Sequence, residues 1–494
     1  MTNPDRLSGL DSAFLHLERD GAHMHVASIM VFAGQAPSYD QFRRFLESRL
    51  DRVPRYRQRL AFVPLEQGRP VWVDDPHFNV RYHLRHSALP SPGEDAQLAA
   101  LAGRLFAEQL DRDKPLWEMN LVEGLAPGED GVARFAIIVK THHALVDGVS
   151  GVDITSVLFS TSAEEEIVTE QPDWIPRPLP SAADLIGDAV RERLSNPAEF
   201  SRAARALVRS PRRAIVDLGG RIEQTGALAW AGVRSAPPTA LNQPIGPHRR
   251  YGWVNGSLAT FKQIKNGLDG TINDAVLTTV SLGLGRWLRR RGIDTAELTL
   301  TAMVPVSVRS EDQAGQLGNR VSALWAPLPV YEQDPAAAFH YISKKMGDLK
   351  HSDQAVGADT LTELAGFAPP TIASQAARLQ SRQRLYNLVV TNVPGPQQPL
   401  YLLGHQLTAL YPVVPLTKNT SLGVAAMSYC GRLSFGLLAD YDVLPDLGDV
   451  VGDFKAALFD LGRAAETDRH RWDSAEHDSL FSAHTPDGDA LTVA

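Results

Sequence analysis

Two adjacent histidines, His142 and His143, begin the heptapeptide HHALVDG. The unperturbed pKa of histidine is about 6.5, so a histidine held at a strand end can act as a general base near neutral pH. Successive side chains of an extended chain point in different directions, so one of the two faces a reacting group. We predict that His143 takes a proton from a hydroxyl group while that oxygen attacks a carbonyl.

The heptapeptide ends with Asp147 and Gly148. Asp147 could accept a hydrogen bond from His143, or it could anchor the loop by pairing with a distant arginine. Gly148 permits the turn into the next helix. The alternative for the whole motif is a pair of hydrogen-bonded histidines in a buried turn. The chain has no HExxH or CxxC pattern, so we expect no metal site.

Two further segments are candidates for the site. Asn273 and Asp274 stand at the start of an apolar helical pattern, where such residues commonly cap the helix and contribute about 1 kcal/mol. In the functional alternative, Asn273 or the helix N-terminus lies near the carbonyl on which negative charge develops. The tripeptide PLW at residues 115–117 is either an aromatic anchor at the site or part of the core.

The elements that position these residues can be predicted from periodicity and turn signals. The histidines follow an apolar, β-favouring run, which places them at a strand end. Strands are predicted over residues 23–32, 133–141, 298–306 and 385–393, with two or three more within 407–438. Helices are predicted over residues 39–60 with a break at Pro54, 97–110, 149–159, 271–291, 360–379 and 447–465.

A chain of 494 residues is too long for one ordinary core, so at least two lobes are expected. We divide it into an N-terminal lobe (1–160), a linker with a basic helical segment (161–247), a C-terminal lobe (248–466) and a flexible tail (467–494). The arginines that make residues 183–234 basic belong either to a solvated helical excursion or to a face that meets anionic lipid or a partner.

The composition, 44% hydrophobic and 21% charged residues, is typical of a folded protein. A net charge of −8 argues against nucleic acid as the partner. The N-terminus lacks the layout of a secretory signal, and no segment approaches the ~20 apolar residues that cross a bilayer, so we expect a cytoplasmic protein. The single cysteine, Cys430, lies in an alternating apolar segment and is expected to be a buried thiol.

Other catalytic patterns are absent from the sequence. There is no GxSxG elbow, which argues against a hydrolase serine, and no GxxxxGK[ST] loop, which leaves nucleotide hydrolysis without support.

Taken together, six segments resemble the bacterial wax ester synthase/acyl-CoA:diacylglycerol acyltransferase family. They are LSGLDSAFL (7–15), PLW (115–117), HHALVDG (142–148), IND (272–274), VPVSVR (304–309) and NVPGP (392–396). HHxxxDG alone is shared with peptide synthetase condensation domains, whereas the combination, in family order, is more specific. The DFGWG element of plant relatives is missing, and the basic segment matches least well.

The resemblance implies an α/β (α+β) fold of two chloramphenicol-acetyltransferase-like lobes, each a mixed sheet flanked by helices, with the active site in a tunnel at their interface. It makes His143 the general base, His142 its supporting neighbour and Asp147 a structural residue, for which we choose Arg309 as the partner. Asn273 becomes a candidate for positioning or oxyanion stabilisation. The candidate substrate-binding residues are Pro115, Leu116, Trp117, Gly148 and Asp274.

The implied reaction moves a long-chain acyl group from acyl-CoA to the hydroxyl of diacylglycerol, of a long-chain fatty alcohol, or of both. It needs no acyl-enzyme intermediate and no cofactor, and peripheral contact with a membrane or lipid inclusion is expected. Two alternatives stay open. One is a stand-alone condensation-type acyltransferase that uses carrier-bound substrates, and the other is a non-enzymatic lipid-surface protein.

Overall fold

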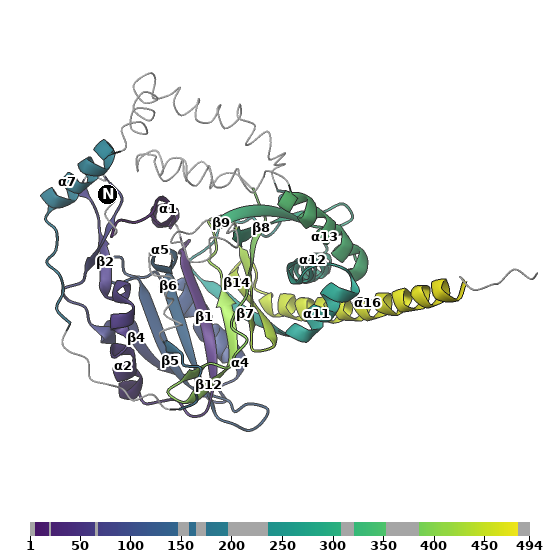
Figure 1. The fold of residues 1–494 in the computed structure, drawn as a ribbon, viewed down its shortest axis with the longest axis horizontal. Helices are drawn as coiled ribbons and strands as arrows, with labels where there is room; N and C mark the ends of the chain where they lie inside the picture. Colours follow the sequence, from purple (N-terminus) through teal and green to yellow (C-terminus); the bar gives the residue numbers. More distant parts are fainter. Residues whose placement is uncertain are drawn as a thin grey trace, which may run out of the picture.

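The computed structural model describes residues 5–18, 21–64, 68–146, 158–164, 174–195, 236–307, 321–351 and 385–482. Two six-stranded sheets, one in each lobe, lie side by side (Figure 1). Each sheet combines one or more parallel strand pairs with antiparallel ones, and helices cover its faces. The predicted class of two mixed sheets flanked by helices is confirmed.

The first sheet has the strand order β11-β12-β1-β6-β5-β4. Only β4 and β5 are parallel among its described pairs. Its strands are β1 (His25–Ala33), β4 (Leu84–Ala88), β5 (Trp117–Leu125), β6 (Arg134–His142), β11 (Tyr401–Leu402) and β12 (His405–Val413).

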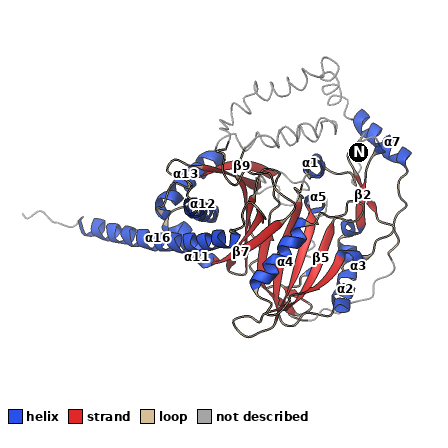
Figure 2. Ribbon diagram, turned by 180° about the vertical axis from the view of Figure 1, so that it is seen from behind, coloured by secondary structure: helices blue, strands red, loops and turns tan. Residues whose placement is uncertain are grey.

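Alternating side chains of β1 pack into two different hydrophobic clusters, because successive residues of a strand point to opposite faces. Met30 and Phe32 pack in a cluster on the face covered by α2 (Tyr39–Glu47). Ile29 and Val31 pack on the opposite face with α4 (Asp95–Ala107), which Figure 2 shows in front of the sheet. The second cluster also contains residues of the second lobe.

The remaining elements that precede the second lobe lie outside the first sheet. They are α1 (Gly9–Leu17), η1 (Leu50–Arg52), η2 (Pro54–Arg57), the β2 (Gln58–Ala61) and β3 (Val71–Asp74) hairpin, α3 (Val80–His83), α5 (His143–Val146) and α7 (Ala182–Ser195). The helix expected over 39–60 thus ends at Glu47, and Pro54 begins a separate 3-10 turn, where its fixed φ is compatible with the first position.

The second sheet has the order β7-β14-β13-β10-β8-β9. Its strands are β7 (Arg249–Ser257), β8 (Leu300–Ser307), β9 (Val321–Leu328), β10 (Leu388–Val393), β13 (Leu422–Tyr429) and β14 (Arg432–Asp440). Its helices are α11 (Leu258–Gly267), α12 (Ile272–Arg290), α13 (Pro335–His351) and α16 (Leu447–Ser482). Alternate strand residues and α12, which is buried along most of its length, form the largest core.

The two lobes are joined by β12, which comes from the second half of the chain but pairs with β1 of the first sheet. Its Pro412 carbonyl accepts a hydrogen bond of 2.9 Å from the Tyr251 hydroxyl, and a Cβ added at Gly436 would lie 1.8 Å from the same oxygen. Only a residue without a side chain allows this approach. Tyr411 stacks on Trp253 at 4.5 Å between centroids.

The pairing of β12 with β1 differs from the domain boundary expected at residue 248, because residues 401–413 complete the first sheet. A second difference concerns residues 467–494, expected as a flexible tail. The helix α16 continues to Ser482, since no glycine or proline occurs between Gly462 and Pro486 to end it.

The expectation of a buried thiol at Cys430 was wrong, because this residue is exposed. Cys430 and Gly431 form the two-residue turn between β13 and β14, with φ angles of 44° and 77°. Such paired positive φ angles are those of a tight hairpin turn. The apolar alternation continues on both sides of the turn, and Gly431 alone marks it.

Predicted helices over 360–379 and most of 149–159 lie outside the described residues. Among the helices that the structure does describe, none has both the length and the apolar character required to cross a membrane.

Replacing Gly436 with alanine tests the contact between the lobes. The added Cβ would meet the Pro412 carbonyl, so the backbone must move, and we expect a loss of about 1–3 kcal/mol in the free energy of unfolding. Chemical denaturation measures it. Gly452→Ala in α16, where an added Cβ has open space, is the matched control. Equal stability of Gly436→Ala and wild type would contradict the close contact between Gly436 and the Pro412 carbonyl.

Candidate active site

The histidine pair lies at the junction between β6 and α5, at the upper end of the first sheet in Figure 1. His142 is the last residue of the strand and is 1% exposed, whereas His143 begins the helix and is half-buried. The backbone N–H of His142 donates to the Leu116 carbonyl at 2.9 Å, and that of His143 donates to the Met24 carbonyl at 2.8 Å. Two neighbouring segments thus fix the main chain of the pair.

The ring of His142 is oriented by the helix that follows it. Its Nδ1 accepts a hydrogen bond of 3.1 Å from the backbone N–H of Ala144. A nitrogen that accepts carries no proton, so in the neutral ring the proton is on Nε2. His142 cannot take a second proton on Nδ1 while this bond persists, which leaves His143 as the member of the pair suited to accept one.

The Nε2 atom of His142 faces the carboxylate of Glu18, whose side chain is 1% exposed. The distance to Oε2 is 3.6 Å, which is longer than a hydrogen bond, so the interaction is electrostatic. His25, which pairs with His142 across the sheet, places its Nε2 3.3 Å from Oε1 of Glu18. Arg112 donates two hydrogen bonds to Oε2, of 2.6 and 3.0 Å.

The charges in this cluster are set by burial and by its own contacts. Burial opposes ionisation of Glu18, but His142, His25 and Arg112 together hold the pKa of its carboxyl well below the usual range. Burial lowers the pKa of His25 to about 3 and lowers that of His23 as well. The cluster therefore contains one carboxylate, one guanidinium and neutral rings at His23 and His25. In the described part of the chain, no group of three or more His, Cys, Asp or Glu side chains is arranged to hold a metal ion.

The helix α1, from the LSGLDSAFL segment, covers the pair. The ring of Phe14 lies 4.1 Å from that of His143 between centroids, and Glu18, four residues later, ends the helix against His142. Residues four apart share one helix face, so one turn of α1 contacts both histidines. Ser8 caps the start of α1 through the backbone N–H of Asp11.

Among the candidate substrate-binding residues, Pro115, Leu116 and Trp117 are buried beside the pair. Trp117 is fully buried, donates its indole N–H to the Tyr56 carbonyl at 2.8 Å and stacks on His83 at 4.5 Å. These contacts account for the tryptophan by packing, and its role in shaping an acyl pocket stays a prediction.

Asp274 caps α12. Its carboxylate accepts from the backbone N–H and the hydroxyl of Thr271, at 2.9 and 2.7 Å, while its own N–H donates to the Thr271 hydroxyl. Asn273, which follows Ile272 in the first turn, is half-buried. A role of either residue at the reacting carbonyl stays a prediction. Asp147, Gly148 and Arg309 lie outside the described residues, as does the expected pairing of Asp147 with Arg309.

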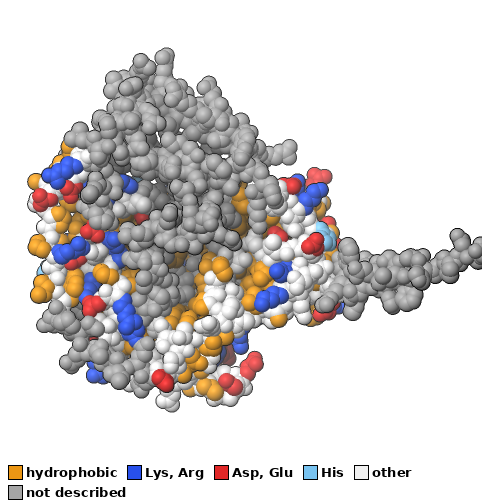
Figure 3. Space-filling view, viewed as in Figure 1, with side chains coloured by type: hydrophobic (Ala, Val, Ile, Leu, Met, Phe, Trp, Pro, Cys, Tyr) orange, Lys and Arg blue, Asp and Glu red, His pale blue; other side chains and the backbone are white. Residues whose placement is uncertain are grey.

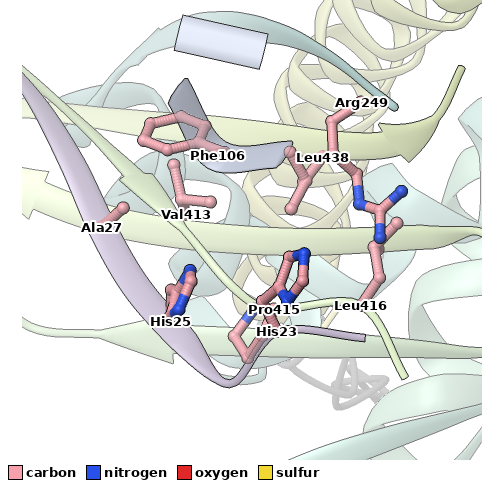
Figure 4. A pocket seen from close by; sticks show the side chains of 9 residues that line it. All are labelled: His23, His25, Ala27, Phe106, Arg249, Val413, Pro415, Leu416 and Leu438. Atoms are coloured by element: carbon pink, nitrogen blue, oxygen red, sulfur yellow. The ribbon is translucent and has the colours of Figure 1, made fainter. Parts of the chain in front are cut away.

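A pocket at the lobe interface adjoins the cluster (Figure 4). His23 and His25 line it from the first lobe, and Arg249 and Leu438 line it from the second. It is a narrow crevice that is partly open to solvent. Arg249 also donates to the Gly21 carbonyl, so it ties the second lobe to the chain just before β1.

Four residues of this cluster were not predicted from the sequence: Glu18, His23, His25 and Arg112. One signal could have found His25, because His23 and His25 alternate at the start of a predicted strand and so share a face. Glu18 and Arg112 carry no such signal, since they lie 94 residues apart and meet only in the folded chain.

Comparisons with known proteins identify the family of the chain. The model of the wax ester synthase/diacylglycerol acyltransferase catalytic domain matches residues 7–276, and that of the C-terminal domain of the same family matches residues 317–461. A probable diacylglycerol O-acyltransferase of Mycobacterium tuberculosis is 33% identical over 475 residues, covering 94% of this chain and 98% of that protein.

Solved structures give the same result. A wax ester synthase/diacylglycerol acyltransferase from Marinobacter aquaeolei is 25% identical with a TM-score of 0.65, covering 93% of this chain and 100% of that chain. The starter condensation domain of rhizomide synthetase, 14% identical with a TM-score of 0.53 over 93% of this chain and 94% of that chain, shares the fold.

The fold and the histidine motif are those of an acyltransferase. The chain belongs to the wax ester synthase/diacylglycerol acyltransferase family. The alternative of a non-enzymatic protein is thereby set aside.

Buried neutral histidines make the stability depend on pH. The folded state holds the pKa of His25 at about 3 and that of His83 at about 4, below the ordinary 6.5. Between these values and 6.5 the unfolded chain binds more protons, so the free energy of unfolding should fall as pH falls below 6.5. Each histidine contributes up to about 1.4 kcal/mol per pH unit.

Chemical denaturation of the wild type and His25→Gln at pH 7 and 5.5 measures this slope, which should be shallower in the variant. His77→Gln, at an exposed site, is the control and should keep the wild-type slope. A variant slope equal to that of wild type would show that His25 is not a buried neutral group.

Proposed function

We propose that this acyltransferase moves a long-chain acyl group from acyl-CoA to the free hydroxyl of diacylglycerol, of a long-chain alcohol, or of both. His143 is the general base. It removes the hydroxyl proton while the oxygen attacks the thioester carbonyl directly. The tetrahedral intermediate collapses to an ester, and the protonated His143 returns its proton to the departing CoA thiolate.

The observation that carries this proposal is the different setting of the two histidines. His142 is buried and its Nδ1 is occupied by the Ala144 N–H, whereas His143 is half-buried at the start of α5. General-base catalysis requires a ring that can reach substrate and exchange a proton, which favours His143.

The proposed steps use an activated thioester, so they require no acyl-enzyme intermediate, metal or redox cofactor. General-base assistance contributes typically about 10² to 10⁴-fold, and holding both substrates together contributes further. Asn273 is a proposed positioning or oxyanion donor, and Pro115, Leu116 and Trp117 are proposed to shape the acyl pocket. Gly148 and Asp274 are proposed to support substrate binding, and Asp147 to hold the loop with Arg309.

We further propose that α7 contacts a lipid surface, where both substrates are concentrated. Leu185 and Ala189 pack on the hairpin side of the helix, but Ile186 and Val190 point outward and are 39% and 45% exposed. The preceding Ile175 is 84% exposed, and Arg191 on the next turn is exposed too. In Figure 3 basic, acidic and apolar side chains are interspersed at the left, where Figure 1 places α7. Because Arg191 pairs with Asp188 at 3.4 Å, the exposed apolar face is the feature that favours peripheral contact with a lipid surface.

Replacement of His143 with alanine tests the reaction. We expect CoA release from palmitoyl-CoA to fall by about 10² to 10⁴-fold with dipalmitoylglycerol or hexadecanol as the acceptor, because the base is lost. A thiol assay follows CoA, and the lipid products identify the acceptor.

His86→Ala, at an exposed position on β4, is the control and should keep wild-type turnover. Unchanged turnover by folded His143→Ala would refute the general-base role. Transfer from a carrier-bound acyl group, without transfer from palmitoyl-CoA, would favour the condensation-type alternative.

The lipid contact is tested with the double variant Ile186→Ser, Val190→Ser. Sedimentation with phosphatidylglycerol-containing vesicles should drop several-fold, because the outward apolar face of α7 is removed. Phe459→Ser, which removes a 66% exposed apolar side chain from α16, should bind as wild type does. Equal loss in both variants would indicate that α7 has no special role.

A further inference from the structure

We propose that Glu18 is a positioning residue for acyl transfer, which acts through the ring of His142 on the turn that carries His143. This inference rests on the proposed role of His143 as the base. Glu18 is not in HHALVDG, and it reaches the pair from the end of α1.

Among the described residues around His142, Glu18 is the one that presents a carboxylate to its ring. The Glu18 side chain is 1% exposed, and its two oxygens face different side chains. Oε1 lies 3.3 Å from Nε2 of His25, while Oε2 lies 3.6 Å from Nε2 of His142 and accepts both bonds from Arg112. The Arg112 guanidinium also donates to the Leu15 carbonyl at 2.9 Å, so it holds the end of α1 and its carboxylate together.

The ring of His142 is fixed from two sides. The Ala144 N–H donates to Nδ1, and the carboxylate faces Nε2. This arrangement favours the tautomer with its proton on Nε2, because that N–H points toward negative charge. A flipped ring would present carbon atoms to both partners and lose both interactions.

The fixed ring in turn holds the backbone on which His143 stands. Ala144 is in the first turn of α5, directly after His143, and its N–H is bound by the ring of the residue directly before His143. His143 therefore sits inside a short loop closed by this side-chain bond. Loss of the carboxylate frees the His142 ring and loosens that loop, which displaces the base by more than the reaction tolerates.

A competing explanation is purely structural. The Glu18–Arg112 pair could simply join α1 to the segment before Trp117, with no effect on the histidines. Breaking a buried ion pair destabilises a protein wherever it lies. The test must therefore separate loss of stability from loss of the histidine's orientation.

The first comparison is between Glu18→Gln and Asp453→Asn. Asp453 is a buried carboxylate that pairs with Arg290 between α16 and α12 of the second lobe, so its variant also breaks a buried ion pair. We expect Glu18→Gln to lower kcat by about tenfold to a hundredfold, as with other carboxylates that orient histidines, with KM for palmitoyl-CoA and hexadecanol within about threefold. Asp453→Asn should lose stability and keep kcat.

The second comparison is a double-mutant cycle with His142→Asn. The asparagine oxygen can still accept from the Ala144 N–H, but no ring nitrogen is left for Glu18 to face. If Glu18 acts through His142, adding Glu18→Gln to His142→Asn should change kcat by less than about twofold. Full additivity of the two losses would overturn the proposal in favour of the structural explanation.

A spectroscopic readout is independent of turnover. In protein labelled with ¹⁵N-histidine, the His142 signals, assigned by their loss in His142→Asn, should show an unprotonated Nδ1 and a protonated Nε2. In Glu18→Gln they should broaden or shift toward a mixture of tautomers. Unchanged signals together with unchanged kcat would refute the inference. Normal turnover by His143→Ala would refute the general-base proposal instead, so the two failures are distinguishable.

Discussion

The pairing of β12 with β1 is the interaction on which the two-lobed arrangement depends. β12 is hydrogen-bonded into the first sheet and packs, through Tyr411 and the Pro412 carbonyl, against β7 and β14 of the second. The lobes are thus joined by main-chain hydrogen bonds as well as by side-chain packing. β1, held between β12 and β6, carries His25 and begins just after the chain segment that Arg249 binds at Gly21. The backbone that positions the candidate site is therefore part of the interface between the two lobes.

Within that frame, the histidine pair is organised by a buried polar cluster rather than by the heptapeptide alone. An ionised carboxylate in the interior is costly unless it is paired and hydrogen-bonded. Arg112 meets this requirement for Glu18 with two hydrogen bonds, and the neutral rings of His23 and His25 lie beside the carboxylate without adding positive charge. A neighbouring buried cation, Lys140, is held separately by the Leu105 and Glu108 carbonyls and by Glu118.

Much of this could be predicted from the sequence. The strands that hold the histidine pair and the long buried helix after Thr271 follow from local periodicity and capping signals, which depend on near neighbours in the chain. The pairing of β12 with the first sheet could not be predicted, because a strand has the same alternation of side chains in either sheet. The partners of His142 could not either, since a lone glutamate and a lone arginine resemble surface residues until the fold brings them together. At Cys430 the alternation of apolar residues gave a wrong prediction of burial, because it continues through a hairpin turn.

The late position of β12 in the chain affects how the protein is made. Ala33, at the end of β1, and His405, at the start of β12, are 372 residues apart. At ribosomal rates of about 5–20 residues per second, β1 is synthesised roughly 20 to 70 s before the strand that pairs with it. During that time the nascent first lobe exposes an unpaired edge, which is a template for aggregation. Its folding in the cell therefore cannot be completed lobe by lobe from the N-terminus, and chaperone protection of the emerging chain is the expected requirement.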